Sequence, residues 1–207
     1  MESNTWYTVS KQSLALYARH AGFDLSVYNE YSPAVQQELR RRAVNEAMRA
    51  IELAFDEHKF SLRTIKNGVY VITIANPLAI QYPSGQSQVL YIGRGDIYKR
   101  IKSHFERKLF EFMLSVGGAE FDFHFAKPAR SGTPKYFEYI EQKMLEWFSD
   151  QHGENENQKC WPLLNRIAGA QKNYKDDSTD WWKYPLRGTN KKPLWAMKPT
   201  KHNDFAL

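Results

Sequence analysis

Residues 68–74 read Gly-Val-Tyr-Val-Ile-Thr-Ile, a β-branched run that is typical of a strand. A second strand-like run, Val-Leu-Tyr-Ile-Gly at 89–93, follows a connection that contains Pro, Ser and Gly. Because those residues favour turns and loops, the two runs predict a β-hairpin with a long connection. The centre of the chain is therefore expected to be built on strands.

The elements expected after the hairpin alternate between helix and strand. A helical pattern runs from about Ile97 to Leu114, where two glycines follow, and another runs from about Lys135 to Phe148. Between them, Phe alternates with other residues over 121–126, the period-two pattern of a strand with one buried face. The order β-β-α-β-α predicts an α/β fold with a small mixed or antiparallel sheet flanked by helices.

The two ends of the chain differ from this central part. Helical patterns near residues 11–20 and from Pro33 to Phe55 predict a helical N-terminal extension over residues 1–60. The β-β-α-β-α unit then occupies about residues 61–170. Residues 171–207 mix Lys, Asp, Trp, Pro and Gly without periodicity, so they are expected to form a basic aromatic C-terminal extension. That extension either folds onto the domain or orders on binding.

Composition excludes several classes of protein. Of the 207 residues, 42% are hydrophobic, 25% charged and 14% aromatic, which excludes disorder as the main state. The single cysteine, Cys160, excludes a disulfide framework and a multi-cysteine zinc site, and it suits a reducing compartment. No apolar run has the length of a membrane span, and the N-terminus lacks the pattern of a signal peptide. We therefore expect a soluble, cytoplasmic protein with no membrane partner.

Positive charge is concentrated near the C-terminus. The formal net charge is +6, and residues 181–207 hold six Lys or Arg against one Asp. The same segment carries the aromatic residues Trp181, Trp182, Tyr184 and Trp195. Such a segment suits a polyanion such as nucleic acid, because lysines contact phosphates and aromatic rings stack on bases. Equally, the tryptophans pack on the domain while the lysines stay solvated.

One carboxylate stands out on the helix expected near residues 135–148. At 100° per residue, Glu141 falls inside the apolar stripe formed by Phe137, Ile140, Met144, Leu145 and Phe148. An unpaired ion there is costly, so Glu141 is a candidate functional residue. The alternative is that it pairs with an Arg or lies at the rim of the core. Glu138 and Glu146 fall on the edge and outer face of this helix and are expected to be solvated.

The preceding helix carries a complementary set of side chains. Arg100, His104, Arg107 and Glu111 form one stripe beside its apolar face. Because Arg100 and His104 lie one turn apart, a cation and a titratable imidazole can face one pocket, a pairing suited to binding phosphate and moving a proton. The alternative is a solvated flank with an ion pair between Arg107 and Glu111.

Together these residues resemble the GIY-YIG nuclease family. The sequence has Gly68-Val69-Tyr70 on one strand and Tyr91-Ile92-Gly93 on the next, followed in order by Arg100, Glu141 and Asn165. The resemblance covers about residues 67–166. Val69 replaces the usual Ile, and the loop between the two tripeptides is longer than in minimal members of the family.

The resemblance implies a metal-dependent endonuclease of restriction or phage type that hydrolyses double-stranded DNA. Glu141 would hold one divalent ion, Mg²⁺ or Mn²⁺. Tyr70 would act as general base on the attacking water, and His104 would take its proton onward. Arg100 would stabilise the phosphate, and Tyr91 would orient the water or the phosphate.

Other roles follow from the same resemblance and from the distribution of charge. Asn165 would hold the site together by hydrogen bonds, and Gly68 and Gly93 would let the backbone approach closely. The residues expected to contact DNA are Arg94, Lys99, Lys183, Arg187, Lys191 and Lys192. A homodimer would suit a palindromic target. The alternatives are a catalytically inactive DNA-binding module and a nuclease that acts on RNA or as a toxin.

Overall fold

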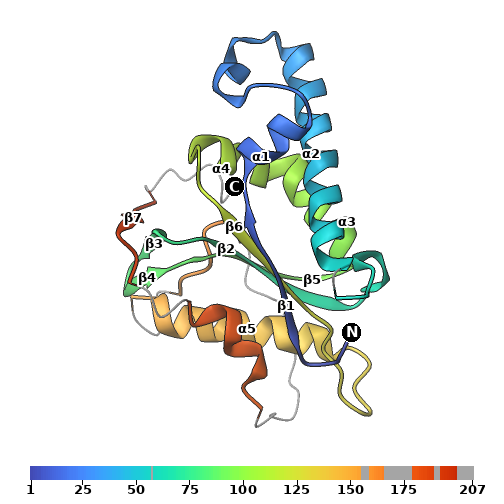
Figure 1. Ribbon diagram of the computed structural model, residues 1–207. Helices are drawn as coiled ribbons and strands as arrows, with labels where there is room; N and C mark the ends of the chain where they lie inside the picture. The colour runs from blue at the N-terminus through green and yellow to red at the C-terminus, as the bar shows by residue number, and fades with distance from the viewer. Residues whose placement is uncertain (57, 155–158, 166–178, 189–191, 200–207) are drawn as a thin grey trace.

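A computed structural model describes residues 1–56, 58–154, 159–165, 179–188 and 192–199 (Figure 1). Within this part of the chain, four strands form an antiparallel sheet in the order β1, β6, β2, β5. Their bounds are β1 Trp6–Gln12, β2 Gly68–Ile74, β5 Val89–Gly95 and β6 Phe121–Ala126. The expected hairpin is confirmed, because β2 and β5 are antiparallel neighbours.

The long connection of the hairpin carries a second, smaller sheet. Strands β3 (Leu78–Tyr82) and β4 (Gly85–Ser87) pair antiparallel, and β7 (Trp195–Met197) lies parallel to β3 on its other side. The C-terminal segment therefore reaches back to the hairpin connection. The described part of the expected C-terminal extension thus folds onto the rest of the molecule.

Helices lie on both faces of the four-stranded sheet (Figure 1). They are α1 Leu14–His20, η1 Leu25–Glu30, α2 Pro33–Asp56, η2 Leu62–Thr64, α3 Ile97–His104, η3 Phe105–Leu109, α4 Phe110–Ser115, α5 Tyr136–His152 and η4 Trp181–Leu186. The segments α3, η3 and α4 follow one another directly, with a π-helical turn at η3, where the sequence predicts one helix. Among the helices of the described residues, none has both the length and the apolar character that crossing a bilayer requires.

The alternation of phenylalanines on β6 explains how the sheet packs. Phe121, Phe123 and Phe125 are buried on one face. On that face, the ring of Phe123 lies 5.7 Å from Phe105 of η3, and that of Phe125 lies 5.9 Å from Phe55 of α2. Helix α5 packs against β5 and β2 from the other side of the sheet (Figure 1). The general α/β class, with an antiparallel sheet flanked by helices, is therefore confirmed.

The beginning of the chain differs from its expectation. The two expected helices are present as α1 and α2, but Trp6–Gln12, for which no strand was predicted, forms strand β1. Strand β1 pairs with β6, whose backbone groups would otherwise be unpaired on that side. Tyr7 of this strand packs its ring against Phe55 of α2, with centroids 6.0 Å apart. The N-terminal segment thus shares the sheet and the core of the central domain.

Candidate active site

The two tyrosines of the expected site lie on neighbouring strands and stack on each other. Strands β2 and β5 pair so that Tyr70 lies opposite Gly93, and Tyr91 lies opposite Ile72. The tyrosine rings have centroids 5.7 Å apart and an interplanar angle of 20°. A Cβ on Gly93 would lie 2.5 Å from the Tyr70 hydroxyl oxygen and from Cε1 of Tyr91. Glycine is therefore needed at this position for the tyrosines to lie over the strand.

Helix α3 is held close to β2 at its first turn. The side chain of Asp96 caps the helix by accepting a hydrogen bond of 3.2 Å from the backbone N–H of Lys99. A Cβ on Gly68 would lie 2.7 Å from side-chain atoms of Ile65 and Ile97, so this glycine lets the helix pack tightly on the strand. These contacts fix the position of the turns that follow.

His104, the last residue of α3, contacts both tyrosines. Its Nε2 lies 2.6 Å from the hydroxyl oxygen of Tyr70, and its ring centroid lies 4.2 Å from that of Tyr91. Burial, together with the positive charges of Arg100 and two neighbouring basic residues, lowers the pKa of His104 to about 3. The imidazole is therefore neutral at pH 7, and with the proton on Nδ1 its Nε2 accepts a hydrogen bond from Tyr70.

Arg100 lies beside the same cluster on the exposed side of α3. Burial lowers its pKa, but the hydroxyls of Tyr70 and Tyr91 and the carboxylate of Glu141 raise it, and the net shift is upward. Burial is also the main cause that raises the pKa of Tyr70 well above 10, against the opposing charge of Arg100. At neutral pH a charged guanidinium therefore lies next to a protonated tyrosine and a neutral imidazole.

Glu141 points from α5 into this region and is only 14% exposed. Its Oε2 lies 3.0 Å from Nε of Arg94, so the expected pairing with an Arg is present. Burial raises the pKa of Glu141 to about 6, although Arg94 and Arg100 oppose the shift. Glu138 is also paired, with Nη1 of Arg94 at 3.4 Å, and is only 15% exposed. The expectation that Glu138 is solvated is wrong, because a helical projection does not show a partner that comes from β5.

These groups meet around β5, the edge strand of the four-stranded sheet among the described residues. Because side chains alternate along a strand, Tyr91 and Arg94 leave β5 on opposite faces. Tyr91 contacts His104 of α3, and Arg94 pairs with Glu141 of α5. Burial is the main cause that raises the pKa of Tyr91, and the negative charge of Glu141 adds to it. Side chains from both faces of the sheet therefore act on each other at this edge.

Asn165 closes the outer edge of β5. Its Oδ1 accepts a hydrogen bond of 2.9 Å from the N–H of Ile92, and its Nδ2 donates one of 2.8 Å to the carbonyl of the same residue. The N–H of Leu164 donates to the carbonyl of Leu90 at 2.9 Å, and Lys108 donates to the carbonyl of Leu164 at 3.1 Å. Asn165 thus supports the strand that carries the site. The sequence does not indicate this role of Lys108, because the residue lies in η3 and its partner Leu164 is 56 positions away in the chain.

The residues expected to contact DNA divide into paired and exposed ones. Arg94 is paired with the two glutamates of α5, and Lys183 pairs with Asp180 at 2.9 Å. Lys99, Arg187 and Lys192 are exposed. Lys191 lies outside the described residues.

The aromatic residues of the C-terminal segment divide in the same way. Trp182 is buried, and the ring of Trp181 lies 5.9 Å from that of Trp6, whose Nε1 donates to the carbonyl of Trp181 at 3.0 Å. Tyr184 and Trp195 are exposed, at 68% and 69%. Part of this segment therefore belongs to the core, while two rings remain accessible to a partner.

Near Glu141 lie the carboxylates that could hold a hard divalent ion of the Mg²⁺ type. Within the described ranges, no group of three or more His, Cys, Asp or Glu side chains could hold a metal. Mg²⁺ does not need such a group, because it keeps several waters and is bound by one or two carboxylates together with substrate phosphates. Glu141, with Glu138 close by on the same helix face, offers carboxylates of that kind.

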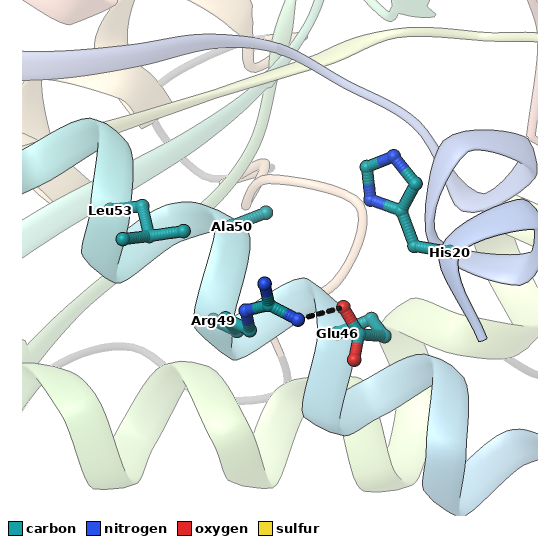
Figure 2. A pocket seen from close by; sticks show the side chains of 5 residues that line it. All are labelled: His20, Glu46, Arg49, Ala50 and Leu53. Carbon is teal, nitrogen blue, oxygen red and sulfur yellow. Dashed lines mark hydrogen bonds and ion pairs between the residues drawn. The ribbon is translucent and has the colours of Figure 1, made fainter.

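A separate hollow lies between α1 and α2. Figure 2 shows the side chains that line it: His20, Glu46, Arg49, Ala50 and Leu53. Glu46 and Arg49 form an ion pair of 3.4 Å across one turn of α2. None of the expected catalytic residues lines this hollow, so the candidate active site remains the cluster around β5.

Comparisons of the chain with known proteins gave no relatives. No family model matches it, and no curated protein and no solved structure was found to match it either.

Proposed function

We propose that this chain is a metal-dependent endonuclease that hydrolyses phosphodiester bonds of double-stranded DNA. The observation that carries the proposal is the distance of 2.6 Å between the Tyr70 hydroxyl and Nε2 of His104, beside Arg100 and within reach of the charge of Glu141. Phosphodiester hydrolysis needs a route for the water proton, a cation for the phosphate and a Lewis acid. The cluster supplies groups for the first two and a carboxylate to hold the third.

The proton route runs from water through Tyr70 to His104. A tyrosine whose pKa is raised by burial is protonated at neutral pH, so its hydroxyl accepts the water proton only while it donates its own to Nε2 of His104. The charge of Arg100 contributes to the low pKa of His104. A DNA phosphate bound to Arg100 offsets that charge and raises the proton affinity of the imidazole. Substrate binding therefore makes His104 a better acceptor for the Tyr70 proton.

The remaining groups stabilise and orient the reacting phosphate. Arg100 is a cation that can form two parallel hydrogen bonds to phosphate oxygens. Glu141 would hold a divalent ion, which would supply Lewis-acid stabilisation of the charge that develops on the phosphate and on the leaving oxygen. Tyr91 is stacked on Tyr70 and packed on His104, so it keeps both rings in place, and its hydroxyl would orient the water or the phosphate.

Other parts of the proposal rest on the sequence. The restriction-type or phage-type role, the cytoplasmic location and a homodimer on a palindromic target are expectations that follow from the family resemblance, composition and symmetry. The exposed Lys99, Arg187 and Lys192 and the accessible rings of Tyr184 and Trp195 support a nucleic-acid partner, because they combine phosphate-binding charge with surfaces for stacking.

The proposal is tested by offering one preparation several polymers. Wild-type protein and Glu141→Gln are incubated with plasmid DNA, single-stranded DNA and RNA in Mg²⁺ and in Mn²⁺, and the products are separated on a gel. We expect cleavage of plasmid DNA by the wild type only. Discrete fragments support a site-specific enzyme, and a smear supports cutting without sequence preference.

Two other results would replace the proposal. Cleavage of RNA alone would make the chain a ribonuclease. Binding of DNA without cleavage of any polymer, in either metal, would make it an inactive DNA-binding module.

A further inference from the structure

We propose that Arg94 competes with the divalent ion for the carboxylate of Glu141, and that the guanidinium released when the ion binds then takes a DNA phosphate. This inference rests on the proposed function and concerns the order in which the same site is assembled. It makes Arg94 a positioning residue that couples ion binding to DNA binding.

The first observation is the geometry of the pairing. Nε of Arg94 lies 3.0 Å from Oε2 of Glu141, and Nη1 lies 3.4 Å from Oε2 of Glu138. The two carboxylates are 14% and 15% exposed, and the Arg94 side chain is 28% exposed. The guanidinium of Arg94 therefore already contacts the Oε2 oxygen of each carboxylate. A divalent ion that binds Glu141 through Oε2 would compete with this contact, because two cations beside the same oxygen repel each other.

The second observation is the position of Arg94 in the strand. Arg94 follows Gly93 directly, and Gly93 lies opposite Tyr70 in the register of β2 and β5. Arg94 itself lies opposite Val69. A flexible arginine on a rigid strand, one position along β5 from the residue that lies opposite Tyr70, can leave the carboxylates and still remain at the edge where the phosphate is proposed to bind.

The third observation is the balance of charge. Glu138 and Glu141 carry two negative charges, and Arg94 and Arg100 carry two positive ones, so these four side chains are neutral together. A divalent ion alone would add two positive charges to a partly buried cluster, which is unfavourable. A DNA phosphate bound by the freed Arg94 offsets part of that excess. Ion and DNA therefore bind better together than separately, and each raises the affinity for the other by the same factor.

The test measures Mn²⁺ affinity of the full chain without DNA, by the electron paramagnetic resonance signal of the free ion. Arg94→Gln should bind Mn²⁺ about tenfold more tightly than the wild type. Arg49→Gln is the matched control, because it removes the same charge from the ion pair with Glu46 on α2 (Figure 2) and should leave the affinity unchanged. Arg94→Lys keeps the positive charge but replaces the planar, forked guanidinium with a compact ammonium, and it should give an intermediate affinity even if Arg94→Gln folds poorly.

A second arm measures DNA binding in a Tyr70→Phe background, which keeps the DNA intact. With Mn²⁺ present, Arg94→Gln should lower the slope of log affinity against log salt by about one, the value for one lost phosphate contact. Without Mn²⁺ the slope should not change, because Arg94 then stays on the carboxylates. An equal loss of slope in both conditions would overturn the inference.

The outcomes separate this inference from the proposed function. If Glu141→Gln abolishes Mn²⁺ binding while Arg94→Gln leaves it unchanged or weaker, the metal site stands and the competition by Arg94 is wrong. If neither the wild type nor Arg94→Gln binds Mn²⁺, the metal assignment and this inference both fail.

Discussion

The hydroxyl oxygen of Tyr70 lies 2.6 Å from Nε2 of His104, although the two residues are 34 positions apart and belong to a strand and a helix. The contact exists because β2 is central in the sheet and α3 packs directly over its first residues. It joins a protonated tyrosine to a neutral imidazole in a buried place. In that state the Tyr70 hydroxyl can pass its proton to Nε2 of His104 when it receives a proton from water.

Tyr70→Phe should lower the rate of DNA cleavage by at least about 100-fold, the usual contribution of a general acid or base. The phenylalanine keeps the ring that stacks on Tyr91, so stability should fall only by the loss of one buried hydrogen bond, about 1 kcal/mol. Tyr17→Phe is the control, because it removes another buried hydroxyl, which donates to Gln12 at 2.9 Å. That variant should lose stability but keep its cleavage rate. A Tyr70→Phe protein that cleaves at the wild-type rate would remove Tyr70 from the proton route.

Gly93→Ala should reduce both activity and stability. The added Cβ would lie 2.5 Å from the Tyr70 hydroxyl oxygen, so the stacked tyrosines have to move. Overpacking of this kind costs about 1–3 kcal/mol, which denaturant unfolding measures directly. Gly117→Ala is the matched control, since its nearest neighbour, the carbonyl oxygen of Leu114, would be 3.9 Å away. Equal unfolding midpoints for the two variants would show that the close approach at Gly93 is not needed.

His124 should make stability depend on pH. It lies on the face of β6 opposite the phenylalanines, where Thr8 and Thr73 hydroxyls contact its two ring nitrogens at 2.8 and 3.1 Å. Burial lowers the pKa of His124 from 6.5 to about 4. Between these values the unfolded chain holds a proton that the folded chain does not, so stability falls as the pH is lowered from about 6.5 to 4. The loss is at most about 3 kcal/mol.

The measurement compares His124→Gln with the wild type by urea unfolding between pH 4 and 7. Because Glu141 and His104 also titrate differently in the folded chain, only the difference between the two proteins isolates His124. The wild type should lose more stability than the variant on acidification. Parallel curves would show that His124 does not bind a proton on unfolding in this range.

Arg187→Gln combined with Lys192→Gln should weaken DNA binding without affecting the fold. Both residues are exposed, and each lost phosphate contact lowers the slope of log affinity against log salt by about one. Point substitutions are preferable to removal of the C-terminal segment, because Trp182 and Leu186 are buried in the core. Arg49→Gln on α2 is the control for loss of one positive charge. An unchanged slope in the double variant would exclude these residues from phosphate contact.

The parts of the fold predicted correctly from the sequence are those with strong local patterns. The β-branched run of β2 and the alternating phenylalanines of β6 specify strands by themselves. The sequence does not predict strand β1, because Trp6–Gln12 ends in Ser, Lys and Gln rather than in a β-branched or alternating apolar pattern, and its pairing with β6 makes it a strand. Such pairing depends on residues more than a hundred positions away, which no local pattern contains.

The candidate site shows the same division. A helical projection found Glu141 because its own helix surrounds it with apolar residues, but it placed Glu138 in solvent. Both glutamates pair with Arg94, which lies on strand β5 and not on their own helix. Sequence order brought the tyrosines, Arg100, His104 and Glu141 together as candidates. The distances between these side chains, and their approach to the edge strand β5 from both faces of the sheet, can be seen only in the tertiary structure.

If the cluster around Tyr70, His104 and Glu141 cleaves DNA with a divalent ion, cleavage depends both on that ion and on the Glu141 carboxylate. The decisive experiment measures the single-turnover rate of plasmid cleavage over a range of Mg²⁺ concentrations for the wild type and Glu141→Gln. The wild-type rate should rise to a plateau with Mg²⁺, while Glu141→Gln binds the plasmid but does not cut it at any concentration. Equal cleavage by the two proteins at the same Mg²⁺ concentration would show that Glu141 does not hold a catalytic metal ion.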